Sequence, residues 1–105
     1  MDKNLHRRRA RRAWPELVAA AKRGEPLSYK DLSASIGEHW RAAAWFLGVI
    51  QRYCAKMGLP RLQALAVNQQ TRVPGKGYAG NRGRRAHARE VERVRAQRWP
   101  KKAPF

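Results

Sequence analysis

A short apolar stripe at helical spacing predicts a helix over residues 28–36. Ser28 suits the N-cap, and Asp31 suits the first turn because a carboxylate there complements the helix dipole. Gly37 follows where a left-handed residue commonly ends a helix. The stripe consists of Tyr29, Leu32 and Ile36.

A longer stripe begins almost at once and predicts a second helix that ends at Gly58, since Pro60 prevents its continuation. The stripe consists of Ala43, Leu47, Ile50, Cys54 and Met57, flanked by Trp40, Phe46 and Tyr53. Two helices joined by so tight a turn predict a helix-turn-helix, whose second helix enters a nucleic-acid groove. A helical hairpin within a core is the alternative for the same spacing.

Helical patterns also flank this pair. Pro15 suits a first turn, so the preceding helix is expected to be well formed from near Trp14 and to end at Gly24. Its inward positions are Trp14, Leu17, Val18 and Ala21. Residues 84–98 resume a helical period, with Ala88, Val91, Val94 and Arg95 expected to face inward. Trp99 and Phe105 are expected to pack back on the domain.

Residues 59–78 predict a β-hairpin with an irregular second arm. A strand-like run over residues 62–67 is followed by turn-forming residues 68–71, and Pro74 limits the return strand. Leu27 is expected to be a short extended segment that pairs with this hairpin. The order of elements predicts a winged helix-turn-helix, a mainly α fold with a small β-hairpin (α+β).

The expected organisation is one domain with basic ends. A flexible basic arm spans residues 1–12, the winged helix-turn-helix spans residues 13–80, and a basic C-terminal helix and tail spans residues 81–105. The arm carries five arginines in six positions from Arg7. A solubilising tail is the alternative interpretation of that run.

Charge sets this chain apart from an ordinary small domain. Its 105 residues include 24 Lys and Arg against 7 Asp and Glu, a net charge of +17. The two ends, residues 1–23 and 81–105, carry most of the excess. Such a field favours polyanions, above all nucleic-acid phosphates. A ribosomal or membrane-surface role would require the same charge.

The residues that carry chemistry are scattered. The seven acids are scattered, the three histidines lie far apart from one another, and Glu38 with His39 is the only adjacent acid–imidazole pair. The single Cys54 falls on an apolar stripe. The glycine-rich residues 75–85 lack the spacing of nucleotide-binding loops. We therefore expect no catalytic residues, no enzyme activity, no metal and no cofactor. With no apolar span or signal peptide in the sequence, we expect a cytoplasmic protein without membrane attachment, nucleoid-associated if it binds DNA.

Candidate nucleic-acid contacts follow from the predicted elements, on the second helix, the hairpin tip, the arm and the basic loop. They are His39, Arg41, Trp45, Arg52 and Lys56 on the helix, Arg72 and Lys76 on the hairpin, Arg7, Arg8 and Arg9 on the arm, and Arg82, Arg84 and Arg85 on the loop.

Four segments follow one another in an order that matches a known family: LSYKDLSASIG, WRAAAWFLGVI, GLP and GYAGN. With them, residues 27–81 resemble the DNA-binding domain of the alkylguanine-DNA alkyltransferases and alkyltransferase-like proteins. That family has a T-Y-x-x-L-A-x-x-x-G helix, an R-A-V-G recognition helix, a P-C-H-R active-site segment and a G-x-Y-x-G-G loop. The resemblance implies a winged helix that inserts its second helix into the minor groove, with Arg41 at the family's arginine position. Residues 62–67 contain no cysteine, histidine or P-C-H-R, so alkyl transfer is not expected. The chain is also similar to small uncharacterised bacterial proteins.

Three hypotheses remain open on the sequence. The first is a small protein that binds duplex DNA through the winged helix-turn-helix, without catalysis. The second is an RNA or ribonucleoprotein factor that stacks bases on Trp45 and Tyr78. The third is an inhibitor, carried by a bacterial mobile element or phage, that binds a protein or nucleoprotein partner. The sequence leaves the oligomeric state open.

Overall fold

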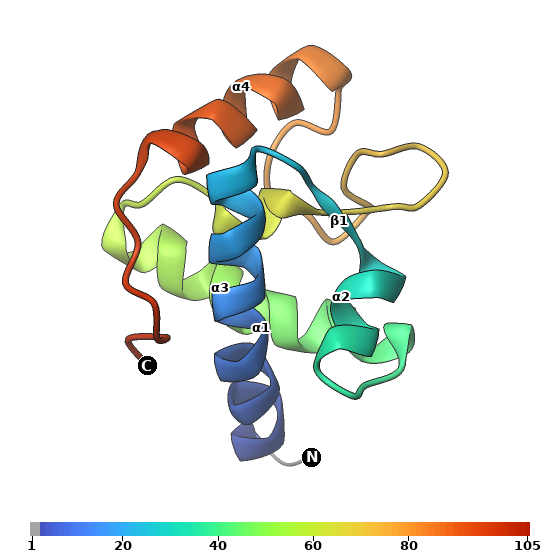
Figure 1. Cartoon of the computed structure of the whole chain (residues 1–105), viewed down its shortest axis with the longest axis vertical. Helices are drawn as coiled ribbons and strands as arrows, with labels where there is room; N and C mark the ends of the chain where they lie inside the picture. Colours follow the sequence, from blue (N-terminus) through green and yellow to red (C-terminus); the bar gives the residue numbers. More distant parts are fainter. Residues whose placement is uncertain (1–2) are drawn as a thin grey trace.

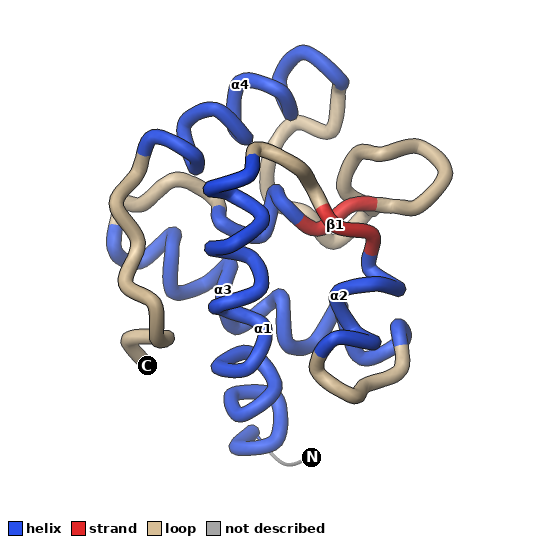
Figure 2. Tube along the Cα trace, viewed as in Figure 1, coloured by secondary structure: helices blue, strands red, loops and turns tan. Residues whose placement is uncertain are grey.

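Helices dominate residues 3–105, the part of the chain that the computed structural model describes. A two-stranded parallel sheet lies between them (Figures 1 and 2). The elements in order are α1 (Lys3–Arg23), β1 (Leu27–Ser28), α2 (Tyr29–Ser35), the 3-10 helix η1 (Trp40–Ala42), α3 (Ala43–Met57), the 3-10 helix η2 (Leu62–Leu65), β2 (Ala66–Val67) and α4 (Arg84–Ala96).

The basic segment at the start of the chain is helical. α1 runs without interruption over Lys3–Arg23, so the expected flexible arm is wrong for residues 3–12; residues 1–2 lie outside the described part. Ala10 and Ala13 have no exposed surface, which shows that this end of α1 packs on the core. Pro15 removes one amide donor but lies inside the helix without ending it.

The sheet joins distant segments and is not a hairpin. Leu27 of β1 pairs with Ala66 of β2, and the two strands are parallel. Parallel strands require a long crossover connection, which α2, η1, α3 and η2 form here. The expected β-hairpin is therefore wrong. Most of its first arm is η2, and only Ala66–Val67 is extended.

The chain after β2 turns back without forming a return strand. The side-chain oxygen of Asn68 accepts hydrogen bonds from the amides of Gln70 and Thr71, at 2.9 and 3.2 Å. The Asn68 amide donates to the carbonyl of Val73, and Pro74 then has no amide to continue a ladder. The segment that was expected to form a wing is consequently an irregular loop.

The helix pair α2 and α3 forms at the expected positions. Ser28 Oγ accepts a hydrogen bond from the Asp31 amide at 3.0 Å, which confirms the N-cap of α2. Gly37 and Gly58, just beyond the two helices, have φ angles of 73° and 66°. These left-handed conformations favour glycine. Met57, expected on the apolar stripe, is 55% exposed because it lies at the very end of α3.

Trp14 lies at the centre of the core and holds the C-terminal tail. Its ring meets those of Tyr53, Trp99 and Phe105 edge-on, with centroids 5.6 to 5.8 Å apart. Its indole Nε1 donates to the carbonyl oxygen of Pro100 at 2.9 Å. The tail thus turns back from α4 and runs down beside the core (Figure 1).

Two ionisable side chains lie on the buried face of α4. His87 Nε2 lies 2.7 Å from the carbonyl oxygen of Ala64, in η2. Glu90 accepts hydrogen bonds from the Arg61 amide at 2.8 Å and from Arg93 Nε at 2.9 Å. These polar contacts fasten α4 to the segment that precedes β2.

Candidate nucleic-acid interface

The N-terminal half of α1 braces the turn between α2 and η1. Glu38, in that turn, forms ion pairs with Arg9 at 2.9 Å and with Arg12 at 2.8 Å. The imidazole of His6 stacks on Trp45 of α3, with centroids 5.3 Å apart and rings 13° from parallel. Arg9, predicted to contact nucleic acid from a flexible arm, is therefore used within the fold.

The turn leads into η1, which presents an aromatic and a cationic side chain to solvent. His39 is the N-cap of η1, and its Nδ1 accepts a hydrogen bond from the Arg41 amide at 3.1 Å. Trp40 is 53% exposed, and the guanidinium of Arg41 lies 5.6 Å from the centre of its ring. An arginine stacked on an indole gains a cation–π attraction that limits its conformations.

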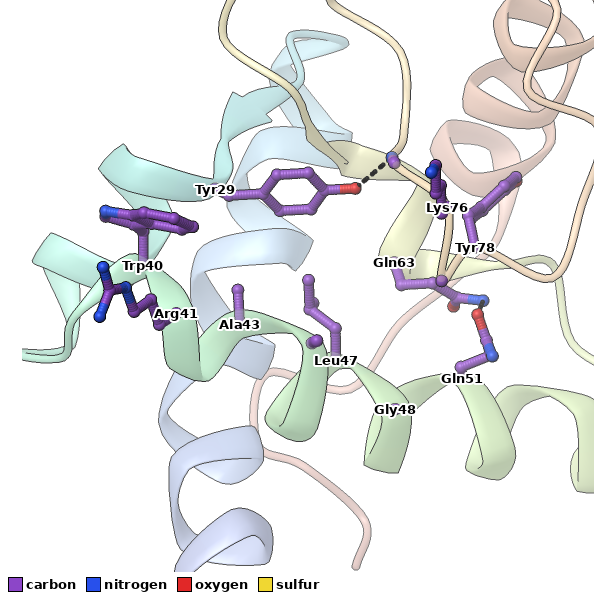
Figure 3. A pocket seen from close by; sticks show the side chains of 13 residues that line it. Tyr29, Trp40, Arg41, Ala43, Leu47, Gly48, Gln51, Gln63, Lys76 and Tyr78 are labelled. Atoms are coloured by element: carbon purple, nitrogen blue, oxygen red, sulfur yellow. Dashed lines mark hydrogen bonds between the residues drawn. The ribbon is translucent and has the colours of Figure 1, made fainter.

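A cavity of about 270 Å³ opens beside η1 (Figure 3). Its base is formed by α3, and its opposite wall is formed by Tyr29 and by loop residues 75–78. Trp40 and Arg41 border one side, and Lys76 and Tyr78 border the other (Figure 3). The α3 residues that line it are Ala43, Ala44, Leu47, Gly48 and Gln51.

Hydrogen bonds hold the loop in place as a wall of the cavity. Tyr29 Oη accepts from the Gly75 amide at 2.6 Å, and Gln51 Oε1 accepts from the Ala79 amide at 3.0 Å. A Cβ on Gly80 would lie 2.7 Å from the ring of Tyr78, so glycine is required for the ring to fold back there.

Both phenols that face the cavity stay neutral at physiological pH. Burial raises the pKa of Tyr29, although the hydrogen bond from Gly75 and the charge of Arg82 oppose the shift. Burial, and then the charge of Glu90, raise the pKa of Tyr78 to about 12. A neutral, partly apolar cavity between two cations is suited to an uncharged ring attached to an anionic group.

The predicted contact residues do not all share this surface. Arg41 and Lys76 line the cavity, and Trp45 lies next to η1 on α3. Arg72 is exposed on the loop, and its guanidinium donates to the carbonyl oxygen of Pro26 at 2.9 Å. The remaining exposed cations lie farther along α1 and α3 and around the start of α4: Arg7, Arg8, Arg52, Lys56, Arg82, Arg84 and Arg85. Arg84 and Arg85 were expected on the loop but are the first two residues of α4.

The cavity itself was not predicted. Its aromatic wall residue Tyr29 was assigned only to the core, and Gln51 and Gln63 were given no role. The glycines at positions 75, 77 and 80 around Tyr78 were the available signal, because closely spaced glycines often mark a close backbone approach.

Comparisons of the chain with known protein families, with curated proteins and with solved structures find no match. Within residues 3–105, no helix combines the length and apolar character needed to cross a bilayer. The same residues bring no three His, Cys, Asp or Glu side chains together in a group that would hold a metal ion.

Proposed function

We propose that this protein binds nucleic acid without catalysis, and that duplex DNA is its principal target. The helix pair α2 and α3, with η1 between them, acts as a helix-turn-helix that places η1 and the start of α3 in a groove. The loop over residues 68–80 takes the place of a wing. The net charge of +17 and the basic end of α1 next to η1 support phosphate contacts.

The cavity beside Arg41 is the observation that carries the proposal. An unstacked base requires flat apolar surfaces for its faces and hydrogen-bonding groups for its edge. Trp40 and Tyr78 supply aromatic surface on opposite sides, and Gln51 and Gln63 supply amide groups at one end (Figure 3). Arg41 supplies a cation at the mouth for the flanking phosphates. The arrangement fits a base that has left the stack of a bound duplex.

A salt series tests the binding itself. Fluorescence anisotropy is measured with duplex DNA, single-stranded DNA and hairpin RNA of matched sequence. If six to ten phosphates are contacted, the affinity for duplex DNA falls by about 10³ to 10⁵ between about 50 and 200 mM salt. An affinity that does not change with salt would contradict the proposal.

A second experiment tests the cavity. A duplex containing 2-aminopurine becomes brighter when that base leaves the stack, so its fluorescence reports base capture. Ala44→Leu places a larger side chain in the cavity and should abolish the increase. Ala55→Leu, the matched control, enlarges another exposed alanine of α3 outside the cavity and should retain it. An undiminished signal with Ala44→Leu would rule out base capture here.

RNA is the second candidate, and the exposed indoles favour it. Trp40 and Trp45 are 53% and 54% exposed, and unpaired bases stack well on such rings. In the same anisotropy series, tighter binding to hairpin RNA than to duplex DNA would establish RNA as the principal target.

A further inference from the structure

The positive charge of the protein gathers at the two ends of α1. One group of exposed arginines lies on its N-terminal half, next to the turn that precedes η1: Arg7, Arg8, Arg11 and Arg12. At the other end, Lys22 and Arg23 close the helix, and α4 packs nearby. Arg95 of α4 lies against Gly24, where a Cβ would be 3.4 Å from its guanidinium. Figure 1 shows α4 at the end of the molecule opposite to the start of α1.

The cations at the two ends of α1 lie farther apart than the screening length at physiological ionic strength. An α-helix rises about 1.5 Å per residue, so Arg8 and Arg23 lie about 22 Å apart. This distance exceeds twice the Debye length of about 8 Å at physiological ionic strength. Between Arg12 and Lys22, the only charged residue of α1 is Glu16. No continuous row of cations therefore runs along α1 from one group to the other.

The outward side of α4 is strongly cationic. The helix buries His87, Glu90, Val91 and Val94 on one side. The opposite side and its flanks carry exposed residues, namely Arg84, Arg85, Ala88, Arg89, Glu92, Arg93, Arg95 and Ala96, here called the α4 outer face. Glu92, its single acid, is 71% exposed and lies 3.9 Å from Arg95. The face thus keeps a clear excess of guanidinium groups.

We propose that the α4 outer face is a second nucleic-acid surface, so that one molecule bridges two duplex segments. The inference rests on the proposed function, because η1 and α3 hold the first duplex. Arg85 and Arg89 are one turn apart, about 6 Å along α4, a rise similar to that of two phosphates along a strand at about 3.4 Å each. Arginines and alanines on an exposed helix contact phosphates and do not distinguish bases, so the second contact is independent of sequence.

Bridging is measured with the full chain and two short duplexes, one labelled with a donor and the other with an acceptor dye. Duplexes of about 12 base pairs are about 40 Å long and limit each to a single site. With duplex in excess, we expect energy transfer between the dyes and, by native mass spectrometry, one protein molecule carrying two duplexes. Saturation at one duplex per protein, or energy transfer only from complexes with two protein molecules, would overturn the inference. Failure to bind any duplex would instead overturn the proposed function.

Charge reversal on α4 provides the matched comparison. Arg85→Glu with Arg89→Glu should bind one duplex and lose the energy transfer. Arg85 lies in the first turn of α4, where a carboxylate is favourable, and Arg89 is exposed farther along the helix, so α4 is expected to remain folded, which circular dichroism checks. Lys101→Glu with Lys102→Glu makes the same charge change on exposed tail residues and should retain the energy transfer. Equal loss in both double variants would overturn the inference.

Glu92→Lys tests the same surface by a substitution that should strengthen bridging. It removes the acid from the middle of the α4 outer face, so bridging should persist to a higher salt concentration than in the unaltered protein. Bridging that fails at the same or a lower salt concentration would overturn the role of this face.

Discussion

Glu90 is a buried carboxylate whose partners keep it ionised. Burial by itself raises the pKa of Glu90, but the hydrogen bonds from the Arg61 amide and the Arg93 guanidinium, with the charges of both arginines, lower it below the ordinary value of 4.5. A carboxylate with a lower pKa in the folded state stabilises the fold above its unfolded-state pKa. That stabilisation is lost as the pH falls from about 4.5 through the folded-state pKa.

We therefore expect Glu90→Gln to lower the free energy of unfolding by about 1–3 kcal/mol at neutral pH, because it weakens hydrogen bonds to a buried charged group. The loss should be smaller at about pH 4, below the unfolded-state pKa, because the unfolded chain then binds a proton that the folded carboxylate does not. Glu92→Gln changes an exposed carboxylate of the same helix and should stay within about 0.5 kcal/mol. Urea unfolding at the two pH values measures both, and an equal loss at each would contradict the role given to the Glu90 charge.

Arg41 is the cation on which the proposed interface depends most. If it contacts a base edge or a phosphate beside the cavity, Arg41→Ala should weaken duplex binding by about 1–3 kcal/mol, measured by anisotropy at fixed salt. Lys56→Ala removes the same charge at the far end of α3 and should have the smaller effect of one screened phosphate contact. Equal losses would assign Arg41 to general electrostatic attraction.

Gly58, which ends α3, tests whether its left-handed backbone conformation requires glycine. Gly58 has a φ angle of 66°, so Gly58→Ala should cost about 1 kcal/mol although no atom lies within 4 Å of the added Cβ. Gly77 also has open space for a Cβ but does not have a positive φ angle, and Gly77→Ala should be close to neutral. Thermal unfolding of the two variants separates backbone strain from crowding, and a similar change in both would contradict the left-handed cap.

At the scale of elements, local signals were enough for the helix pair and not for the parts held by distant contacts. Ser28 caps the start of α2, and Gly37 and Gly58 adopt the left-handed backbone conformations that follow α2 and α3, so each of these signals is local in the sequence. The low apolar content at the start of α1 predicts a flexible arm. This segment is instead held by Glu38 and Trp45, which are far along the chain. The pairing of Leu27 with the later strand-like run was predicted and is confirmed at Ala66, but the strands are parallel and no hairpin forms.

The sequence pattern predicted the buried face of α4 incorrectly for a related reason. Ala88 was expected inside, but it is exposed, and His87 lies inside at hydrogen-bond distance from the Ala64 carbonyl. A hydrophobic pattern cannot detect a polar side chain that is buried with its partner. The cavity escaped prediction similarly, because its walls come from α2, η1, α3 and a loop. Of the predicted contacts, Arg41 and Lys76 line it, together with Tyr78, which was predicted only as a base-stacking residue for RNA.

The ion pairs of Glu38 with Arg9 and Arg12, here called the brace, connect α1 to the α2–η1 turn. They predict an effect on DNA binding opposite to the one expected from net charge alone. Glu38→Gln removes a negative charge, which by itself should strengthen binding to duplex DNA. It also breaks the ion pairs with Arg9 and Arg12 that position η1, so we expect weaker binding. Glu25→Gln makes the same charge change at an exposed position after α1 and should bind slightly more tightly. Anisotropy decides, and tighter binding by Glu38→Gln would show that the brace has no role in recognition.

At the scale of the whole molecule, the charge of +17 acts on stability and on binding with opposite dependence on salt. Like charges repel in the folded protein, so screening by salt should raise the melting temperature of the free protein. If the protein binds duplex DNA as proposed, duplex at one hundred times Kd should stabilise the fold by about 2.7 kcal/mol, and salt should weaken that binding. The rise in melting temperature caused by duplex DNA should therefore shrink as salt increases from about 50 to 200 mM.

Differential scanning fluorimetry with and without duplex measures the two trends in one experiment. Lys101→Glu with Lys102→Glu lowers the net charge without touching the proposed interface, so its free form should respond less to salt. Its duplex-induced rise should still decline, because the phosphate contacts at η1 and α3 remain. A duplex-induced rise that is constant across the salt range would mean that binding releases few counterions. In that case the charge would not be the source of affinity, and the apolar cavity alone would have to account for it.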